Sequence, residues 1–329
     1  MLTTLLTPKR STILATALAG CLSAALPTAV QAVEKIHFLI PGGAGGGWDG
    51  TARGTGEALN KSGLIETVSY ENMSGGGGGI AIAHLIETAS QQKNTLMVNS
   101  TPIVIRSLSK VFPQSYRDLT PIATTIGDYG AFVVRKDSPY TSFKQVADDF
   151  REKPRSVKIA GGSARGSMDH LVAAQAFQAA GGNPLRVKYI AFNTGGEAMA
   201  NLLSGETSLL STGLSEALAL QQAGEVRILA MTGDKRSPAA PNVPTLLEQG
   251  YDATFVNWRG FFAAPGISTA QKADYIETLQ KMYETEEWAA VRDRYGWSEN
   301  FRPDEQFLTF LEDQEKTMGN LMKKLGFLK

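Results

Sequence analysis

The sequence has little of what builds disulfide scaffolds and metal sites. It contains one cysteine, Cys21, and three histidines, His37, His84 and His170, which are far apart in the chain. One cysteine cannot form a disulfide within the chain, and the histidine spacing matches no metal-ligand pattern. The chain also lacks an excess of positive charge, because 32 Lys and Arg balance 32 Asp and Glu. We therefore expect no disulfide framework, no metal or other cofactor, and no nucleic-acid partner.

Beyond residue 32 the sequence also lacks an apolar run of the roughly 20 residues that a membrane-spanning helix needs. Residues 1–32 follow the pattern of a secretory signal, in which Lys9 and Arg10 precede a mostly apolar stretch. The segment ends at Val30-Gln31-Ala32, where small residues suit signal peptidase, so we expect export and cleavage after Ala32. The alternative is a lipid anchor at Cys21, since Leu18-Ala19-Gly20-Cys21 resembles a lipoprotein cleavage site.

Glycine, in contrast, is abundant, and many of the 34 glycines lie in turns that follow short apolar runs. Segments with helical spacing follow these turns, and this alternation predicts an α/β protein with mostly parallel sheets. The segments 270–295 and 305–325 are charged and favour helix, with no strand signal between them. The expected strands are Lys35–Ile40, Thr67–Tyr70, Thr95–Val98, Val157–Ala160, Val187–Phe192, Thr207–Leu210 and Val226–Met231.

Two glycine-rich turns in the first third of the chain are candidate anion sites. Pro41 to Asp49 follows the first expected strand and precedes a helical pattern, so backbone amides and the helix dipole would favour a negative group. Asn72 to Gly79 repeats the design, either as a second site or as a plain mobile loop. The spacing Gly45-x-Gly47-x-x-Gly50, with Glu71 after the next strand, also fits a dinucleotide fingerprint. A secreted dinucleotide-dependent oxidoreductase is therefore the alternative function.

A third such turn, from Gly161 to His170, carries a positive charge. Ser163 and Ser167 offer hydroxyl donors, and Arg165 can hold a carboxylate with two hydrogen bonds. Arg165 is otherwise a solvated residue at the lip of the site, and His170 is otherwise a structural histidine with satisfied hydrogen bonds.

A fourth turn, Asn193 to Glu197, has the capping-box spacing between Thr194 and Glu197, so Glu197 is interpreted as a helix cap and Thr194 as a cap or a ligand donor. Ser211, Thr212 and Ser215 follow the next strand, where hydroxyls donate to a ligand or cap the helix.

No catalytic set accompanies these turns. The sequence has no Gly-x-Ser-x-Gly elbow, and its only cysteine lies in the signal segment. Trp258, Arg259 and Phe261-Phe262 form a cluster that we interpret as core or hinge. Amide-rich turns with hydroxyls and no nucleophile paired with a base indicate a binding protein, not an enzyme.

Taken together, the motifs resemble the substrate-binding proteins of tripartite tricarboxylate transporters, the TctC-type branch of the Bug receptor family. The resemblance covers nearly the whole chain after residue 32, in the right order. The matching stretches are Gly45-Gly46-Gly47-Trp48-Asp49-Gly50-Thr51-Ala52-Arg53, Glu71-Asn72-Met73-Ser74-Gly75, Asp137-Ser138-Pro139-Tyr140, Gly161 to His170, Gly195-Gly196-Glu197-Ala198, Val243-Pro244-Thr245, Asn257-Trp258-Arg259-Gly260-Phe261 and Ala264-Pro265-Gly266.

The resemblance implies a type II periplasmic binding protein fold, in which two α/β domains are joined by two crossing strands and hold the ligand between them. One domain would comprise 33–132 and 257–329, and the other 133–256. The implied function is capture of a di- or tricarboxylate such as citrate in the periplasm by domain closure. The protein, expected as a monomer, would deliver it to the small and large membrane subunits of the transporter. A receptor for a membrane signalling kinase is a further alternative.

The ligand-binding residues expected from these turns share a position just after a strand or at the start of a helix. They are Gly46, Gly47, Trp48, Asp49, Ser74, Gly75, Gly76, Ser163, Ala164, Arg165, Ser167, His170, Thr194, Gly195, Gly196 and Ser215.

Overall fold

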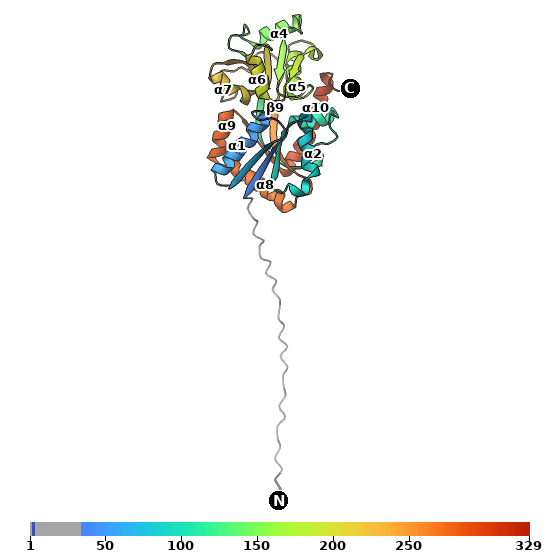
Figure 1. Ribbon diagram of the computed structural model, residues 1–329, viewed down its shortest axis with the longest axis vertical. Helices are drawn as coiled ribbons and strands as arrows, with labels where there is room; N and C mark the ends of the chain where they lie inside the picture. Colours follow the sequence, from blue (N-terminus) through green and yellow to red (C-terminus); the bar gives the residue numbers. More distant parts are fainter. Residues whose placement is uncertain (1, 4–33) are drawn as a thin grey trace. The chain divides into compact units, whose positions relative to one another are not determined.

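The computed structural model describes residues 2–3 and 34–329 (Figure 1). Both expected cleavage sites and the lipid-anchor candidate Cys21 lie outside the described residues. The described chain from Glu34 onward belongs to one compact unit. Within it, the expected domain boundaries near 132 and 256 stay a prediction.

The strands of the described residues form one mixed sheet in the order β2-β1-β3-β9-β4-β7-β5-β6, with β8 and β10 also paired to β4. Strands β1, β2 and β3 are parallel, as are β5, β6 and β7, whereas β9 runs antiparallel to both β3 and β4. Their bounds are β1 Lys35–Ile40, β2 Thr67–Asn72, β3 Thr95–Ser100, β4 Thr120–Arg135, β5 Lys158–Gly161, β6 Lys188–Ala191, β7 Leu209–Gly213, β8 Val226–Met231, β9 Val256–Ala263 and β10 Ser298–Pro303.

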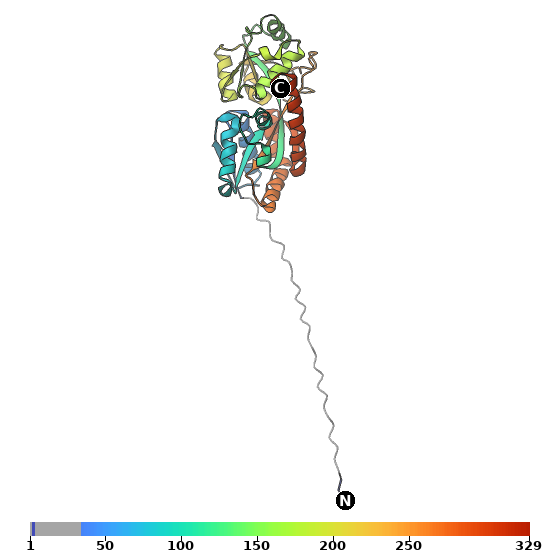
Figure 2. The same cartoon turned by 90° about the vertical axis from the view of Figure 1, so that its right-hand side faces the viewer.

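The long strand β4 pairs with different strands along its two parts. Its residues 120–129 pair with β9 and β10, and its residues 130–135 pair with β7 and β8. We call β1, β2, β3, β9, β10 and residues 120–129 the first half of the sheet, and the remainder the second half. Figures 1 and 2 show the two halves one above the other, each with its own helices.

The expectation of mostly parallel sheets is wrong, because all the pairings of β4, β9 and β10 are antiparallel. All seven expected strands are present. The resemblance implied two crossing strands, but the residue patterns did not locate β4, β9 or β10. Strand β10 has the sequence SENFRP, which contains one large apolar residue and therefore no apolar alternation. From the sequence we expect no strand between the helical segments 270–295 and 305–325, and β10 shows that this expectation is wrong.

The helices flank the two halves. Their bounds are α1 Gly47–Lys61, α2 Gly79–Glu87, α3 Thr101–Leu108, α4 Phe143–Glu152, α5 Met168–Ala179, α6 Gly195–Leu203, α7 Leu214–Gln222, α8 Thr269–Tyr283, α9 Glu286–Tyr295 and α10 Asp304–Lys324. Several start at a hydroxyl cap: Ser142, Ser268 and Thr285 each accept a hydrogen bond from an amide in the first turn of α4, α8 and α9. The cap at Thr285 splits the expected helical segment 270–295 into α8 and α9.

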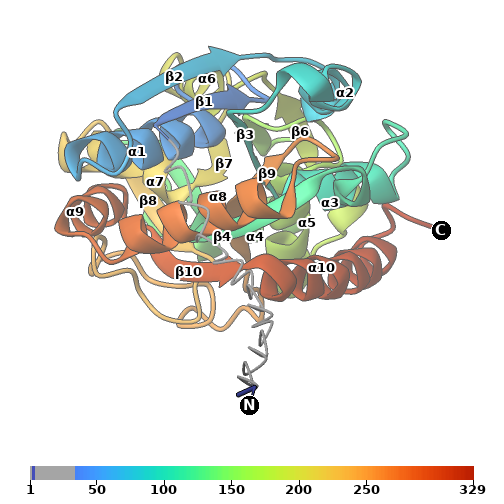
Figure 3. The ribbon, with the colours of Figure 1, turned by 90° about the horizontal axis from the view of Figure 1, so that it is seen from below.

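A shared apolar core joins the halves. One cluster contains Phe132, Phe143 and Phe177 of the second half together with Phe262 and Phe307 of the first. Helix α10 contributes to this cluster and packs on α3, β4 and β10, as Figure 3 shows from below. Because the core continues across both halves, the turns at the facing ends of their strands are held near one another.

Candidate ligand-binding site

A cavity of about 320 Å³ lies where the turns of the two halves meet. Its first wall comes from the turns after β1 and β2 and the start of α3, and its second wall from the turns after β5, β6 and β7. The lining residues are Pro41, Gly42, Gly43, Gly46, Gly47, Trp48, Ser74, Gly75, Gly76, Gly77, Gly78, Ser100, Pro102, Gly162, Ser163, Ala164, Arg165, Ser167, Met168, Asp169, Ala191, Phe192, Asn193, Thr194, Gly195, Glu216, Asn257 and Arg259.

Twelve of the sixteen expected ligand-binding residues line this cavity. They are Gly46, Gly47, Trp48, Ser74, Gly75, Gly76, Ser163, Ala164, Arg165, Ser167, Thr194 and Gly195. They come from four turns far apart in the sequence, which the fold brings to one place. Their role in binding stays a prediction.

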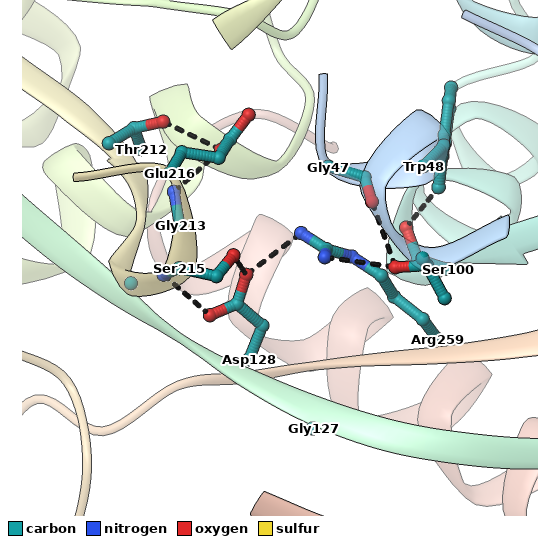
Figure 4. A network of polar contacts seen from close by, with 12 residues as sticks. Gly47, Trp48, Ser100, Gly127, Asp128, Thr212, Gly213, Ser215, Glu216 and Arg259 are labelled. Atoms are coloured by element: carbon teal, nitrogen blue, oxygen red, sulfur yellow. Dashed lines mark hydrogen bonds and ion pairs between the residues drawn. The ribbon is translucent and has the colours of Figure 1, made fainter. Parts of the chain in front are cut away.

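The start of α1 forms the centre of the first wall. Its N-cap residue, Gly46, has an extended backbone and no side-chain capping bond, so the first amides of the helix have no side-chain acceptor. Trp48 donates from Nε1 to Ser100 Oγ at 2.8 Å, which fixes the indole as a wall of the cavity (Figure 4).

The start of α5 forms the matching part of the second wall. Ser167 is its N-cap residue, again without a side-chain capping bond, and is 2% exposed. Ser163 Oγ accepts from the amide of Asp169 at 3.0 Å, and Tyr189 donates to the Ser163 carbonyl at 2.6 Å. Arg165, in contrast, is exposed at the rim.

The start of α6 is capped by its own side chains. Thr194 Oγ1 accepts from the Glu197 amide at 3.1 Å, and Glu197 Oε2 accepts from the Asn193 amide at 3.1 Å. The interpretation of Glu197 as a helix cap is therefore confirmed. Thr194 serves as a cap while it also lines the cavity.

The walls touch each other at the cavity. A Cβ built on Gly43 would lie 2.4 Å from Thr194 Cγ2, so the two residues are in close contact across the site. Arg106 of α3 also donates from Nη1 to the Arg165 carbonyl at 3.5 Å. The two walls are therefore closed on each other in this structure.

Asp49 and His170 are expected residues that do not line the cavity. Their side chains accept hydrogen bonds from backbone amides of the first and third turns. Asp49 accepts from the Gly45 amide at 3.0 Å and from Arg53 at 2.9 Å, so its carboxylate holds the first turn together. His170 accepts at Nδ1 from the Gly166 amide at 3.0 Å. Burial, followed by the nearby charge of Arg165, lowers the pKa of His170 to about 4, so the ring is neutral at pH 7.

The other two expected residues outside the lining are Gly196 and Ser215. Gly196 lies exposed in the first turn of α6. Ser215 Oγ donates to Asp128 at 2.6 Å, and its amide donates to the same carboxylate at 3.2 Å.

A buried charged group at the cavity was not expected from the sequence. Arg259 is 2% exposed, lines the cavity, and donates from Nη2 to Asp128 Oδ2 at 2.9 Å and from Nη1 to Thr51 at 3.1 Å (Figure 4). A Cβ on Gly47 would lie 2.2 Å from Arg259 Nη2, so a larger residue at this position would displace the guanidinium. The sequence pattern indicates only a core or hinge cluster here; the available signal is a charge within the apolar strand NWRGFFA.

Two more polar groups of the lining were not foreseen. Asn257 Oδ1 is buried and has no hydrogen-bond partner among the described residues. Glu216 Oε2 accepts from Thr212 at 2.7 Å and from the Gly213 amide at 3.0 Å. Both Asn257 and Glu216 present amide or carboxylate atoms to whatever occupies the cavity.

Two buried acidic groups of the second wall, Asp169 and Glu216, have raised pKa values. Burial, reinforced by the charge of Glu216, raises the pKa of Asp169 to about 7. Burial also raises the pKa of Glu216, against the opposing effect of Arg259. With a pKa of about 7, the Asp169 carboxyl group is only partly ionised at neutral pH.

The part of the chain that the structure describes contains no group of three or more His, Cys, Asp or Glu that could hold a metal ion. In the same residues, no helix is long and apolar enough to cross a membrane.

Comparison with known proteins adds a family match. Residues 51–327 match the family model described as the tripartite tricarboxylate transporter family receptor. The periplasmic binding protein BugD superposes with a TM-score of 0.79 at 22% identity, covering 89% of this chain and 97% of BugD.

Two further solved structures contain ligands. MatC from Rhodopseudomonas palustris, with bound malate, has a TM-score of 0.77 at 19% identity and covers 87% of this chain and 98% of its own. The R. palustris protein Rpa4515, with adipate, has a TM-score of 0.79 at 20% identity and covers 89% and 97%. These likenesses confirm the predicted periplasmic binding protein fold.

Proposed function

The chain belongs to the family of tripartite tricarboxylate transporter receptors, and on this premise we propose that it captures a small di- or tricarboxylate, such as citrate, in the cavity between its two walls. The family is one of binding proteins, which confirms the expectation that the chain is not an enzyme. The dinucleotide-dependent oxidoreductase therefore has no further support.

One observation carries the proposal: α1 and α5 both begin at the cavity without a hydrogen bond from their own N-cap side chain, although Ser163 Oγ accepts from the Asp169 amide in the first turn of α5. Unpaired amides at a helix start, together with the helix dipole, favour a negative group. Two such starts, one in each wall, suit a ligand with a carboxylate at each end. A cavity of about 320 Å³ is at the small end of the range for small-molecule sites.

We assign binding to the twelve expected residues that line the cavity, and we add Arg259 and Asn257, two polar residues of the same lining. Arg165 would meet a carboxylate at the rim, and the serine and threonine side chains of the lining would add hydroxyls. Bound malate and adipate in the two relatives are small dicarboxylates, which agrees with this chemistry.

Delivery to a membrane permease is the second part of the proposal. Because the walls already touch, a ligand would be enclosed in this arrangement, and the closed form would be recognised by the small and large membrane subunits of the transporter. A signalling kinase that reads the same closed form is the alternative partner. Reconstituted uptake with the permease subunits separates the two, because only a transport receptor supports accumulation of the carboxylate.

Calorimetry of residues 33–329 against mono-, di- and tricarboxylates tests the ligand class. We expect heat of binding from at least one di- or tricarboxylate, weaker binding of monocarboxylates, and none of NAD. If every carboxylate is silent, the proposed function is wrong.

Export is the third part of the proposal, and it rests on the signal pattern of residues 1–32. We propose cleavage after Ala32 and release into the periplasm. Mass spectrometry of the mature N-terminus should start at Val33, and a diacylated Cys21 would replace this view with a lipid-anchored receptor.

A further inference from the structure

Glu216, in the first turn of α7, directs only one of its carboxylate oxygens to the protein. Oε2 accepts both side-chain and backbone hydrogen bonds, from Thr212 Oγ1 at 2.7 Å and from the Gly213 amide at 3.0 Å. Oε1 has no hydrogen-bond partner among the described residues, and the residue lines the cavity (Figure 4). A carboxylate oxygen on a cavity wall is a strong acceptor that needs a donor.

The position of Oε1 is fixed by its surroundings. A Cβ on Gly195 would lie 2.1 Å from Oε1, so this oxygen packs directly against the start of α6. The two bonds at Oε2 prevent the carboxylate from turning away. Oε1 is therefore held at the second wall in a defined direction.

No charged group near Glu216 donates a hydrogen bond to its Oε1 among the described residues. Arg259, the cation whose charge acts on Glu216, directs Nη2 to Asp128 and Nη1 to Thr51. Asp128 and Asp169 are themselves acidic and contribute no cation. Since no described residue donates to Oε1, the contents of the cavity can supply its donor.

We propose that Glu216 Oε1 accepts a hydrogen bond from a hydroxyl or ammonium group on the carbon chain of the ligand, so that the site prefers hydroxy- or amino-carboxylates over the bare carboxylate of the same length. This inference rests on the proposed carboxylate-binding function. The amide-rich starts of α1 and α5 would hold the terminal carboxylates, and Glu216 would select the substituent between them. A bare methylene at this place would leave Oε1 without a donor, and an additional carboxylate there would be repelled.

Matched ligand pairs test the preference by calorimetry with residues 33–329. Malate and aspartate are each compared with succinate, and citrate with propane-1,2,3-tricarboxylate. We expect at least one donor-bearing ligand to bind about tenfold or more tightly than its bare partner, and the malate and aspartate arms distinguish hydroxyl from ammonium.

In the variant Glu216→Gln, the group that faces the cavity becomes a hydrogen-bond donor instead of an acceptor. The Gly213 amide can only donate, so the carbonyl oxygen of the glutamine stays beside it and the NH₂ group faces the cavity. We expect the preference for an ammonium group, which can only donate, to fall to within about threefold of equal affinity. A hydroxyl can accept from the NH₂ group, so Glu216→Asp tests the preference for a hydroxyl. Glu248→Gln is the matched control, since Glu248 pairs with Arg236 and Thr245 away from the cavity lining, and it should leave the preference unchanged.

Glu216→Asp provides a second variant if the glutamine variant does not fold, because it shortens the side chain and withdraws the oxygen; the preference should shrink there too. Equal wild-type affinity within every pair, or a preference that survives both substitutions, overturns the role of Glu216 while carboxylate binding stands. Silence from all the ligands counts against the carboxylate function itself, and this inference fails with it.

Discussion

Arg259 and Asp128 form an ion pair of 2.9 Å whose side chains are only 3% and 0% exposed. Asp128 lies in β4 and Arg259 in β9, and Ser215 at the start of α7 donates to the same carboxylate. Thr51 of α1 accepts from the same guanidinium. The pair thus connects helices that begin at opposite walls of the cavity.

Removing one partner of this pair should be costly, because the other charge stays buried. We expect Arg259→Ala to lower the free energy of unfolding by about 3 to 5 kcal/mol in urea titrations followed by circular dichroism. The matched control is Arg117→Ala, which breaks an ion pair with Glu315 whose side chains are 50% and 32% exposed and should change stability by about 0 to 1 kcal/mol. Equal effects of the two substitutions would contradict the structural role of Arg259.

Arg165 is the exposed cation at the cavity rim, and its contact with ligand is directly testable. If it holds a carboxylate, Arg165→Ala should weaken binding by about 1.5 to 3 kcal/mol, the range for hydrogen bonds to charged groups. Arg155→Ala removes an exposed arginine that does not line the cavity, and it should leave calorimetric affinity unaltered. Wild-type affinity in the Arg165 variant would exclude Arg165 from the site.

Gly43 tests whether binding depends on closure of the walls. A Cβ there would lie 2.4 Å from Thr194 Cγ2, so Gly43→Ala should oppose the closed arrangement without changing either half. We expect ligand affinity to fall about tenfold or more, with thermal stability of the ligand-free protein unchanged. Gly319→Ala, where α10 leaves room for a methyl group, should keep affinity and add about 0.5 to 1 kcal/mol of stability. Unchanged affinity in the Gly43 variant would count against closure.

Asp169 and His170 should give opposite slopes of stability against pH. Burial raises the pKa of Asp169 from 3.8 to about 7, so the folded protein keeps a proton that the unfolded chain loses, and stability falls as pH rises through that window. Burial lowers the pKa of His170 from 6.5 to about 4, so stability from this residue rises with pH between those values.

Asp169→Asn removes the fall in stability with rising pH that Asp169 causes and leaves the rise that His170 causes. The melting temperature of the variant relative to wild type should therefore increase steadily from pH 4 to pH 7 and then level off. Asp313→Asn, at an exposed position of α10, should show a constant difference from wild type. A constant difference for Asp169→Asn would mean that its carboxyl group titrates normally.

Local patterns predicted much of the fold and part of the site. The strands before glycine turns and the helices after them were foreseen, because apolar runs, glycine and caps act within a few residues. Strand β9 was missed as a strand, since NWRGFFA contains a charge and a glycine within an apolar run. The four expected residues that lie outside the cavity lining, Asp49, His170, Gly196 and Ser215, share a position in a turn with the others, and position does not say which way a side chain points.

The sequence by itself determined where amide-rich turns occur, that no nucleophile accompanies them, and which family the ordered motifs resemble. These properties depend on short segments and on residue types. Only the tertiary structure decided that Arg259 meets Asp128, 131 residues away, and that Glu216 lines the cavity with one oxygen that has no partner among the described residues. The physical reason is that the meaning of a charge depends on its burial and on its partners, which long-range packing brings together.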